Sequence, residues 1–273
     1  MTPKLSVWSS YYHELTPEDA ILELKKHGIT ATEFSIEHAA TLLGKDDVVS
    51  AGKSFADFAR KEGFDVSQGH LWHDCEFCAY TEHYERLLDW LILFDAMGIR
   101  NAVLHPDRLL GTDMTFEEKL ELNIKRLNDL AAFMKARGMK MRICLENLKK
   151  VWVTIDDMTA LTDRLDPDYF GVCLDTSHLH LCGGDNVDFI RRAGDRLHAL
   201  HIGDNDGSGD QHRMPYSVGA IDFMGVLSAL REVGYDGLFN MEIPGENRVP
   251  IDIKGYKLDF IRKTYNYICE VTK

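Results

Sequence analysis

Short apolar or β-branched runs alternate eight times with longer segments of helical periodicity along the 273-residue chain, and this alternation constrains the fold most. The runs have the length of strands and lie at residues 5–9, 31–35, 65–69, 101–105, 141–146, 170–175, 197–201 and 238–242. Between them apolar residues recur at helical spacing, for example over residues 16–27, 49–62, 80–97, 116–137, 222–233 and 256–269. Strands that alternate regularly with helices predict a parallel sheet.

The residues at the ends of the predicted helices support the same interpretation. Several predicted helices end at a glycine just before the next strand, namely Gly28, Gly63, Gly98, Gly138 and Gly234. Thr16 and Pro17 are typical of an N-cap followed by the first helical position. Eight strand–helix units without a linker or low-complexity break predict a single (β/α)8 barrel domain over residues 1–273. An open doubly wound sheet is the alternative, but no Gly-x-Gly-x-x-Gly follows the first strand, so the barrel is favoured.

The composition restricts the classes of partner. The chain is 45% apolar, enough for a large core, and carries 31 lysines and arginines against 44 acids, a formal charge of −13. A nucleic-acid-binding protein brings a basic surface to the phosphates, so this charge argues against DNA or RNA as the main partner. No apolar run approaches the roughly 18 residues of a transmembrane helix. We therefore expect no transmembrane helix.

The six cysteines and the N-terminal residues suggest a cytoplasmic protein. Residues 1–5 enter a strand-like run without the charged and apolar regions of a signal peptide. Cys144 and Cys173 lie inside apolar runs and are interpreted as small core residues in a reducing compartment. Cys75 and Cys78 form one Cys-x-x-Cys pair, but no second pair completes a zinc site and no thioredoxin-like strand precedes it. We interpret this pair as part of a plain loop.

Metal-ligating side chains stand at the ends of six consecutive predicted strands. They are His70, His105, Glu146, Asp175, His201 and Glu242. In a (β/α)8 barrel the carboxyl ends of the strands meet on one face, where the chemistry of such enzymes takes place. Three further candidates lie in the following loops: His178, three residues after Asp175, and the pair Asp210 and His212. The sequence therefore predicts a metal centre on this face.

The types of ligand indicate the metal and its chemistry. Mixed imidazole and carboxylate ligands without cysteine suit zinc, manganese or cobalt, with magnesium as a further candidate. A carboxylate is able to bind a metal through one oxygen and to move a proton with the other, so Glu146 and Glu242 are predicted to be both ligands and acid/base groups. The number of ions stays open between one and three per chain.

Several motifs resemble those of the sugar phosphate isomerase/epimerase superfamily, the xylose isomerase-like barrels, which are related to the apurinic endonuclease family 2. They are Leu145-Glu146-Asn147, Val172-Cys173-Leu174-Asp175-Thr176-Ser177-His178, His198-Ala199-Leu200-His201-Ile202-Gly203-Asp204-Asn205-Asp206-Gly207 and Asn240-Met241-Glu242-Ile243. The resemblance spans essentially the whole chain. It implies the barrel fold, but not one reaction, since the superfamily includes ketose epimerases, inosose isomerases and dehydratases, and apurinic endonucleases.

The two branches imply different centres. The epimerase branch implies one metal held by Glu146, Asp175, His201 and Glu242, with the two glutamates as the acid/base pair and His178 in contact with the substrate. The apurinic endonuclease branch implies that all nine candidates are ligands of a three-zinc cluster: His70, His105, Glu146, Asp175, His178, His201, Asp210, His212 and Glu242. The superfamily also implies a homo-oligomer.

Two departures from the family's patterns concern the loops. Residues 213–222 hold only Gly219 where relatives commonly have a tight Pro-Gly-x-Gly turn, and this loop is one residue longer. The loops at residues 73–76 and 204–210 are acidic, whereas the endonuclease branch needs basic loops that face DNA. Binding of a phosphate backbone therefore works against the local field.

The leading hypothesis is a metal-dependent isomerase or epimerase that acts on a keto or aldehydo polyol through a metal-stabilised enediolate. Glu146 and Glu242 move the protons, and loss of a β-hydroxyl from the same intermediate gives an inosose-type dehydratase as an alternative. The hypothesis from a different class is a multinuclear zinc phosphodiesterase of the endonuclease IV type. A non-catalytic sugar-binding module is the third.

Further side chains are candidates for substrate contacts. Trp8, Trp72 and Trp152 lie near the ends of predicted strands, where an aromatic ring is able to pack against a sugar, although core packing explains each of them as well. Lys149 and Arg213 are candidates for binding a phosphate or a hydroxyl group, with a plain surface role as the alternative. No phosphate-cradling glycine loop follows the last two strands, which favours a non-phosphorylated sugar or polyol.

Overall fold

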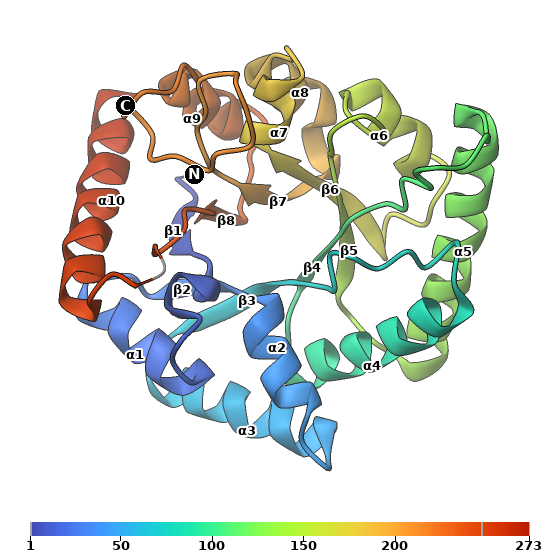
Figure 1. The fold of residues 1–273 in the computed structure, drawn as a ribbon, viewed down its shortest axis with the longest axis horizontal. Helices are drawn as coiled ribbons and strands as arrows, with labels where there is room; N and C mark the ends of the chain where they lie inside the picture. Colours follow the sequence, from blue (N-terminus) through green and yellow to red (C-terminus); the bar gives the residue numbers. More distant parts are fainter. Residues whose placement is uncertain (1, 247, 273) are drawn as a thin grey trace.

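The computed structural model describes residues 2–246 and 248–272, and eight parallel strands form the wall of a barrel (Figure 1). The strands are β1 (Lys4–Val7), β2 (Ala31–Phe34), β3 (Asp65–His70), β4 (Asn101–Leu104), β5 (Arg142–Glu146), β6 (Phe170–Asp175), β7 (Leu197–His201) and β8 (Leu238–Met241). The predicted strands are confirmed to within two residues at either end, and β6 and β7 have the predicted bounds. The predicted α/β fold, a (β/α)8 barrel, is confirmed.

Two hydrogen-bonded sheets make up the wall. One has six strands in the order β2-β3-β4-β5-β6-β7, and the other pairs β1 with β8. The wall continues from β7 to β8 through a parallel bridge between Ile202 and Met241. From β1 to β2 it continues through the Thr32 hydroxyl, which donates to the Val7 carbonyl at 2.6 Å. The β1/β2 edge is thus joined by a side chain rather than by a backbone ladder.

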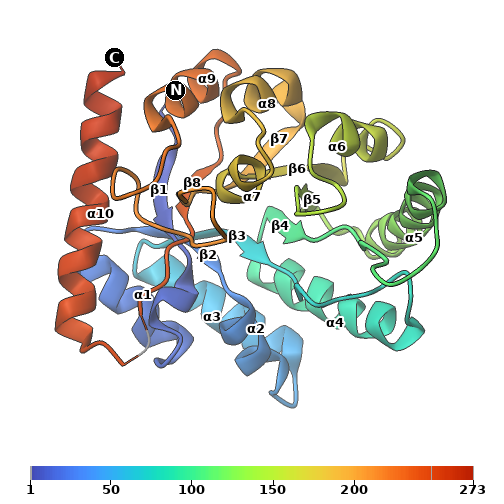
Figure 2. The ribbon, with the colours of Figure 1, turned by 45° about the horizontal axis from the view of Figure 1, so that its top comes forward.

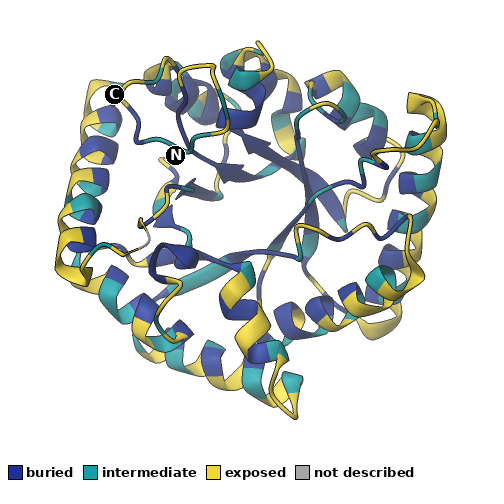
Figure 3. Cartoon of the chain, viewed as in Figure 1, coloured by how far each residue is buried: buried dark blue, intermediate teal, exposed yellow. Residues whose placement is uncertain are grey.

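Helices surround the wall and bury one face of each against it (Figures 1 and 3). They are α1 (Pro17–Lys26), α2 (Ile36–Leu43), α3 (Val48–Lys61), α4 (Thr81–Met97), α5 (Phe116–Arg137), α6 (Ile155–Thr162), α7 (Thr176–Leu181), α8 (Asn186–Ala193), α9 (Phe223–Glu232) and α10 (Ile251–Val271), with two 3-10 turns at Ser9–Tyr12 and Gly194–Arg196. The five glycines predicted to end helices all have φ between +67° and +75°, a region that favours glycine. Within the described residues no helix combines the length and apolar character of a membrane span.

The interior of the barrel has a small apolar cluster with polar side chains beside it. Val103, Cys144, Cys173 and Ala199, from β4 to β7, form a cluster of their own, separate from the main core between the strands and the helices. Because successive side chains of a strand point to opposite faces, residues two positions further along point into the barrel as well. His105, Glu146, Asp175 and His201 are these residues. The strand period thus turns the predicted ligands inward.

All six cysteines are free thiols. Cys144 and Cys173 are fully buried, as predicted for core residues. Cys75 and Cys78 are also buried, and burial raises the pKa of the Cys75 thiol to about 12. A thiol with a raised pKa is a weak nucleophile and metal ligand, which agrees with a structural role for this pair.

Candidate metal centre

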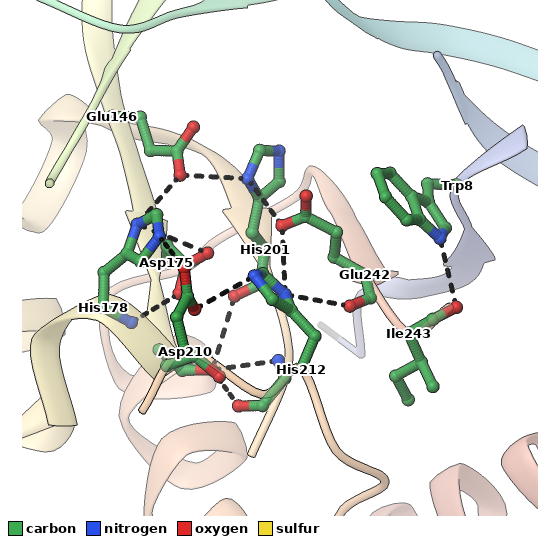
Figure 4. A network of polar contacts seen from close by, with 12 residues as sticks. Trp8, Glu146, Asp175, His178, His201, Asp210, His212, Glu242 and Ile243 are labelled. Atoms are coloured by element: carbon green, nitrogen blue, oxygen red, sulfur yellow. Dashed lines mark hydrogen bonds and ion pairs between the residues drawn. The ribbon is translucent and has the colours of Figure 1, made fainter. Parts of the chain in front are cut away.

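The nine predicted ligands converge at the carboxyl ends of the strands, and Figure 4 draws the part of this network around Glu146, Asp175 and His201. Six of the nine come from the ends of β3 to β8, and the other three come from α7 and the loop after β7. Asp175 has a second function, because it caps α7: its carboxylate accepts a 2.7 Å hydrogen bond from the backbone N–H of His178. This cap fixes His178 beside the centre.

Glu146 lies in the middle of the cluster, with four imidazoles around its carboxylate. Its Oε2 lies 3.3 Å from His70 Nε2 and 3.0 Å from His105 Nε2. Its Oε1 lies 3.3 Å from both His178 Nδ1 and His201 Nδ1. The Glu146 side chain is 2% exposed, so both oxygens are directed at nitrogen atoms and neither at solvent. This is the arrangement of a carboxylate that is able to bridge two cations.

A second group lies on the side of the loop after β7. Asp210 Oδ2 is 3.2 Å from His178 Nε2, and Asp210 Oδ1 is 3.1 Å from His212 Nε2. Lys149 Nζ lies 2.6 Å from Asp210 Oδ2, so the predicted substrate-binding cation pairs with a predicted ligand. His212 has φ +43°, uncommon for a residue with a side chain, and the loop holds it there through backbone hydrogen bonds between Asp204 and Arg213.

Three atoms of the candidate ligands are buried without a hydrogen-bond partner: Asp175 Oδ2, His201 Nδ1 and Glu242 Oε2. His201 Nδ1 lies 3.1 Å from Glu242 Oε2. A buried polar group without a partner costs roughly 1–3 kcal/mol, so native proteins rarely keep several together. Two carboxylate oxygens and an imidazole nitrogen are suitable ligands for a divalent cation, and the residues therefore fit a metal.

Donor atoms fall into three groups, in each of which they lie within 4.8 Å of one another. The groups are His70, His105 and Glu146; Glu146, Asp175 and His201; and Asp175, His178 and His212. Glu146 belongs to two groups, and so does Asp175, which makes these two residues the bridges along the series. Glu242 adjoins the second group through His201, and Asp210 adjoins the third through His178 and His212.

Charges inside the site shift the pKa values of the acids. Burial alone raises the pKa of Glu242, but His201 and His212 outweigh it and lower the value to about 2. The pKa of Glu146 is held well below its usual range by His201 and His105, again against the effect of burial. Both glutamates are therefore ionised at neutral pH, the form that a ligand or a general base needs.

Seven of the nine candidate ligands, all except Asp175 and His201, line a cavity of about 330 Å³. Trp8, His178, Glu146 and Glu242 are among its lining residues, and the Trp8 indole is held by a 3.1 Å hydrogen bond to the Ile243 carbonyl (Figure 4). The other predicted substrate contacts, Trp72, Lys149 and Arg213, do not line this cavity.

Each of these other side chains has a partner elsewhere. Trp72 packs against His83 and lies under the Arg86 guanidinium, and Arg213 forms an ion pair with Asp206 at 3.2 Å. Trp152 is fully buried, and its indole N–H donates to the Asp107 carbonyl, so it belongs to the core. Of the predicted aromatic contacts, the structure brings only Trp8 to the cavity.

A family model described as "Xylose isomerase-like TIM barrel" matches residues 21–264. The chain belongs to this family. It is 28% identical over 162 residues to an inosose dehydratase of Lacticaseibacillus casei, which covers 53% of this chain and 52% of the relative. It is 19% identical over 258 residues to a probable endonuclease 4 of Clostridium botulinum, covering 88% of this chain and 91% of the relative.

A crystal structure of D-psicose 3-epimerase with D-tagatose, from Clostridium cellulolyticum H10, matches with a TM-score of 0.81 at 17% identity, covering 97% of this chain and 99% of that one. At this identity the likeness concerns the fold. The chain spans about half the length, or less, of the curated relatives that match it first, at 54%, 50% and 28%.

One further acid of this xylose isomerase-like barrel contacts a candidate ligand and is not among the residues predicted from the sequence. Glu33 lies in β2, fully buried, and its Oε2 is 2.9 Å from His201 Nε2 and accepts a 2.6 Å hydrogen bond from the Gln68 amide. An acid in the otherwise uncharged strand Ala31–Phe34 is the signal that could have found it. Because Glu33 accepts the proton of Nε2, it leaves Nδ1 of His201 free for a metal.

The other four histidines are oriented in the same way by backbone carbonyls. Each Nδ1 atom lies within hydrogen-bond distance of a backbone carbonyl. The pairs are His70 with Leu71, His105 with His73, His178 with Asn147, and His212 with Glu242. In each case the Nε2 atom faces a carboxylate of the cluster. A partner on the second ring nitrogen of every histidine is the usual arrangement around a metal.

Proposed function

We propose that the chain is a divalent-metal-dependent isomerase or epimerase acting on a keto or aldehydo sugar or polyol. The observation that carries the proposal is the position of two ionised glutamates beside one cavity. Glu146 Oε1 and Glu242 Oε2 lie 3.3 and 3.1 Å from the same atom, His201 Nδ1, and both residues line the cavity with Trp8. Two carboxylates around one point suit removal of a proton from a carbon and its return elsewhere.

Glu146, Asp175, His201 and Glu242 would hold the principal cation. A divalent cation supplies the polarisation of a substrate carbonyl that acidifies the neighbouring C–H bond. One glutamate then takes the carbon-bound proton. The other glutamate, ionised as well, takes a proton from solvent and returns it to the enediolate, and the first releases its proton to solvent. Return to the opposite face gives epimerisation, and return to the adjacent carbon gives isomerisation. Loss of a β-hydroxyl from the same enediolate is the dehydratase variant.

The charged groups around the cavity favour an uncharged substrate. Lys149 is paired with Asp210, and Arg213 with Asp206, so neither predicted cation is free to hold a phosphate. Trp8 offers the cavity an apolar aromatic surface, which suits the C–H face of a sugar ring. His178 lies beside Glu146 and lines the cavity, where we assign it contact with a substrate oxygen or with a further cation. We also place the protein in the cytoplasm.

Hydrogen exchange tests the proposed proton transfer. Ketoses and inososes incubated with the metal-loaded protein in D₂O are expected to gain deuterium at the carbon that loses its proton, as read by NMR. Glu146→Gln and Glu242→Gln are each expected to lower the exchange rate by about 10²–10⁴-fold. Glu37→Gln is the matched control, since Glu37 lines the same cavity without contacting the cluster. Exchange that survives both variants would remove the glutamates from the proposed role.

A multinuclear phosphodiesterase is the second candidate, favoured by the position of Glu146 between two pairs of histidines. The similarity to a probable endonuclease 4 over 88% of the chain supports it too. The formal charge of −13 and the acidic residues Asp74, Glu76 and Asp206 in the loops oppose it. Hydrolysis of bis(p-nitrophenyl) phosphate, or cleavage of DNA with an abasic site, would decide for this candidate if no sugar exchanges deuterium.

A further inference from the structure

Helix α10 presents a second apolar face, which points away from the barrel. Ile253, Tyr256, Phe260, Tyr267 and Val271 are between 47% and 68% exposed and follow one another at helical spacing. The opposite face of the helix is already buried by Leu258, Ile261, Tyr265 and Ile268. Figure 3 shows these two faces as a dark inner side and a light outer side of the helix. One apolar face is enough to attach a helix to a barrel, so the outer stripe needs another explanation.

The stripe continues onto the loop that follows β7. The ring of Tyr216 lies 6.5 Å from that of Tyr267 with the two planes at 83°, and Tyr216 and Val218 are themselves 44% and 60% exposed. Figures 1 and 2 place α10 at the margin of the molecule, with open space on its outer side. We call the five residues of the α10 stripe, with Tyr216 and Val218, the α10 patch.

The α10 patch has the size of half an interface. At about 200 Å² for a large apolar side chain, the exposed parts of its seven residues amount to on the order of 700 Å². Monomeric proteins rarely expose an apolar patch above about 600 Å², whereas one partner of a standard protein–protein interface buries about 800 Å².

The residues of the stripe are arranged almost symmetrically about the middle of the helix. An antiparallel copy of α10, related by a two-fold axis near residue 262, places Ile253 opposite Val271 and Tyr256 opposite Tyr267. Phe260 then meets the aliphatic stem of Lys263. An interface between two identical subunits has to be self-complementary in this way.

The charges of α10 also suit a second copy. The whole chain has a formal charge of −13, which repels a second copy at most surfaces. Apart from Lys254, which is buried and paired with Glu14, helix α10 instead carries three cations and three anions: Lys257, Arg262 and Lys263, and Asp252, Asp259 and Glu270. This face is close to neutral, and two copies meet there with little repulsion.

We propose that the α10 patch is the interface of a two-fold symmetric homodimer in which the α10 helices pack antiparallel. The inference is independent of the reaction that the barrel catalyses. The loop that carries Tyr216 also carries His212, so the dimer covers the outer side of a segment that contributes a candidate metal ligand.

The mass of the protein in solution, by size-exclusion chromatography with light scattering between about 1 and 100 μM, tests the proposal. The expected mass is twice the 31.1 kDa of the chain. Phe260→Asp and Tyr256→Asp are each expected to shift the protein to the monomer, because each places a charge in the stripe. Val49→Asp is the matched control, since Val49 is exposed on α3, outside the patch, and this variant is expected to remain a dimer.

Two results overturn the proposal: a wild-type protein that is monomeric throughout this range, or a dimer that persists in both stripe variants. Circular dichroism and the melting temperature establish that the variants are folded, so that unfolding is not mistaken for dissociation.

Cross-linking tests the antiparallel register separately. With Cys182 and Cys269 replaced by serine, a chain carrying both Tyr256→Cys and Tyr267→Cys is expected to form disulfide-linked dimers on mild oxidation. Each single cysteine variant is expected to remain uncrosslinked, because residue 256 of one copy meets residue 267 of the other and lies far from its own equivalent. Efficient cross-linking of either single variant would contradict the antiparallel register.

Discussion

Replacing Glu33 by glutamine is expected to weaken metal binding without removing any ligand. Glu33 contacts His201 at 2.9 Å in a place where neither side chain is exposed to solvent. Its negative charge makes the imidazole a stronger donor to a cation and fixes which ring nitrogen carries the proton. Glutamine keeps the size of the side chain and an oxygen acceptor, so the variant isolates the effect of the charge.

The expected loss is worked from this one contact. A hydrogen bond to a charged group contributes about 1.5–3 kcal/mol, and a neutral one about 0.5–1.5 kcal/mol. The difference of roughly 1–2 kcal/mol corresponds to a loss of metal affinity of about 5- to 30-fold, which overlaps the 10- to 100-fold typical of such supporting partners. The Gln68 amide, which donates to Glu33 Oε2, keeps its acceptor when the new amide oxygen takes the place of this atom.

Competition against a chelator of known affinity measures this loss directly, with zinc and with manganese. Glu37→Gln is again the matched control, because it changes the same functional group at the rim of the cavity without contact to a ligand. Circular dichroism of the metal-free protein monitors the fold. An affinity within twofold of wild type, for both metals and with an intact fold, would refute the idea that Glu33 acts through His201.

Three further predictions concern stability. Burial and the nearby Arg142 lower the pKa of His198 to about 4. The unfolded state therefore binds more protons than the folded state between pH 6.5 and 4. The contribution of His198 to the free energy of unfolding is complete above about pH 6.5 and is lost as the pH falls toward 4. Discounted for its partial exposure this amounts to about 1–2 kcal/mol, and the free energy of unfolding, measured by urea titration, should fall less between pH 7 and 5 in His198→Asn. Gly245→Ala would place a Cβ against the Tyr11 carbonyl oxygen and should destabilise the fold by about 1–3 kcal/mol in the same assay. Gly209→Ala, with open space around it, should be neutral within about 0.5 kcal/mol. Removal of metal by a chelator should lower the melting temperature, since a ligand present at 100 times its Kd stabilises by about 2.7 kcal/mol; an unchanged melting temperature would contradict a tightly bound cation.

The convergence of the candidate ligands could be predicted from the sequence because the barrel converts positions along the chain into positions in space. Five candidate ligands lie two residues beyond an inward-pointing position of a strand and so continue its inward face: His70, His105, Glu146, Asp175 and His201. Parallel strands end on one face, so residues up to 172 positions apart, from His70 to Glu242, meet there. The pattern of strand ends was therefore sufficient, without knowledge of side-chain contacts.

Side chains whose direction depends on local backbone or packing could not be placed in this way. Trp152 follows β5 but has φ +60°, which turns its ring into the core, and Trp72 packs against His83 and Arg86 rather than toward the cavity. Glu33 was missed for the opposite reason. It points inward from the middle of β2 rather than from its end, and only its contact with His201 reveals what it does.

Charge balance suggests how many ions the centre holds. Five carboxylates lie together, those of Glu33, Glu146, Asp175, Asp210 and Glu242, and Lys149 offsets one of them. With all five histidines neutral, one divalent cation leaves about two negative charges uncompensated in a region where most of these side chains are buried, and burying unpaired charge is costly. Protonated His178 and His212 offset the same two charges when they are not ligands, since the nearby carboxylates raise the pKa of His178 to about 12 and that of His212 to about 10. Two cations would bring the balance to zero when the five histidines are neutral ligands. If His178 and His212 are neutral ligands, about two ions per chain are expected by mass spectrometry of the metal content; if they are protonated, one ion is expected. Since this expectation follows from the buried acids alone, a count of two is compatible with sugar chemistry as much as with phosphodiester cleavage, and the deuterium exchange and hydrolysis assays decide between them.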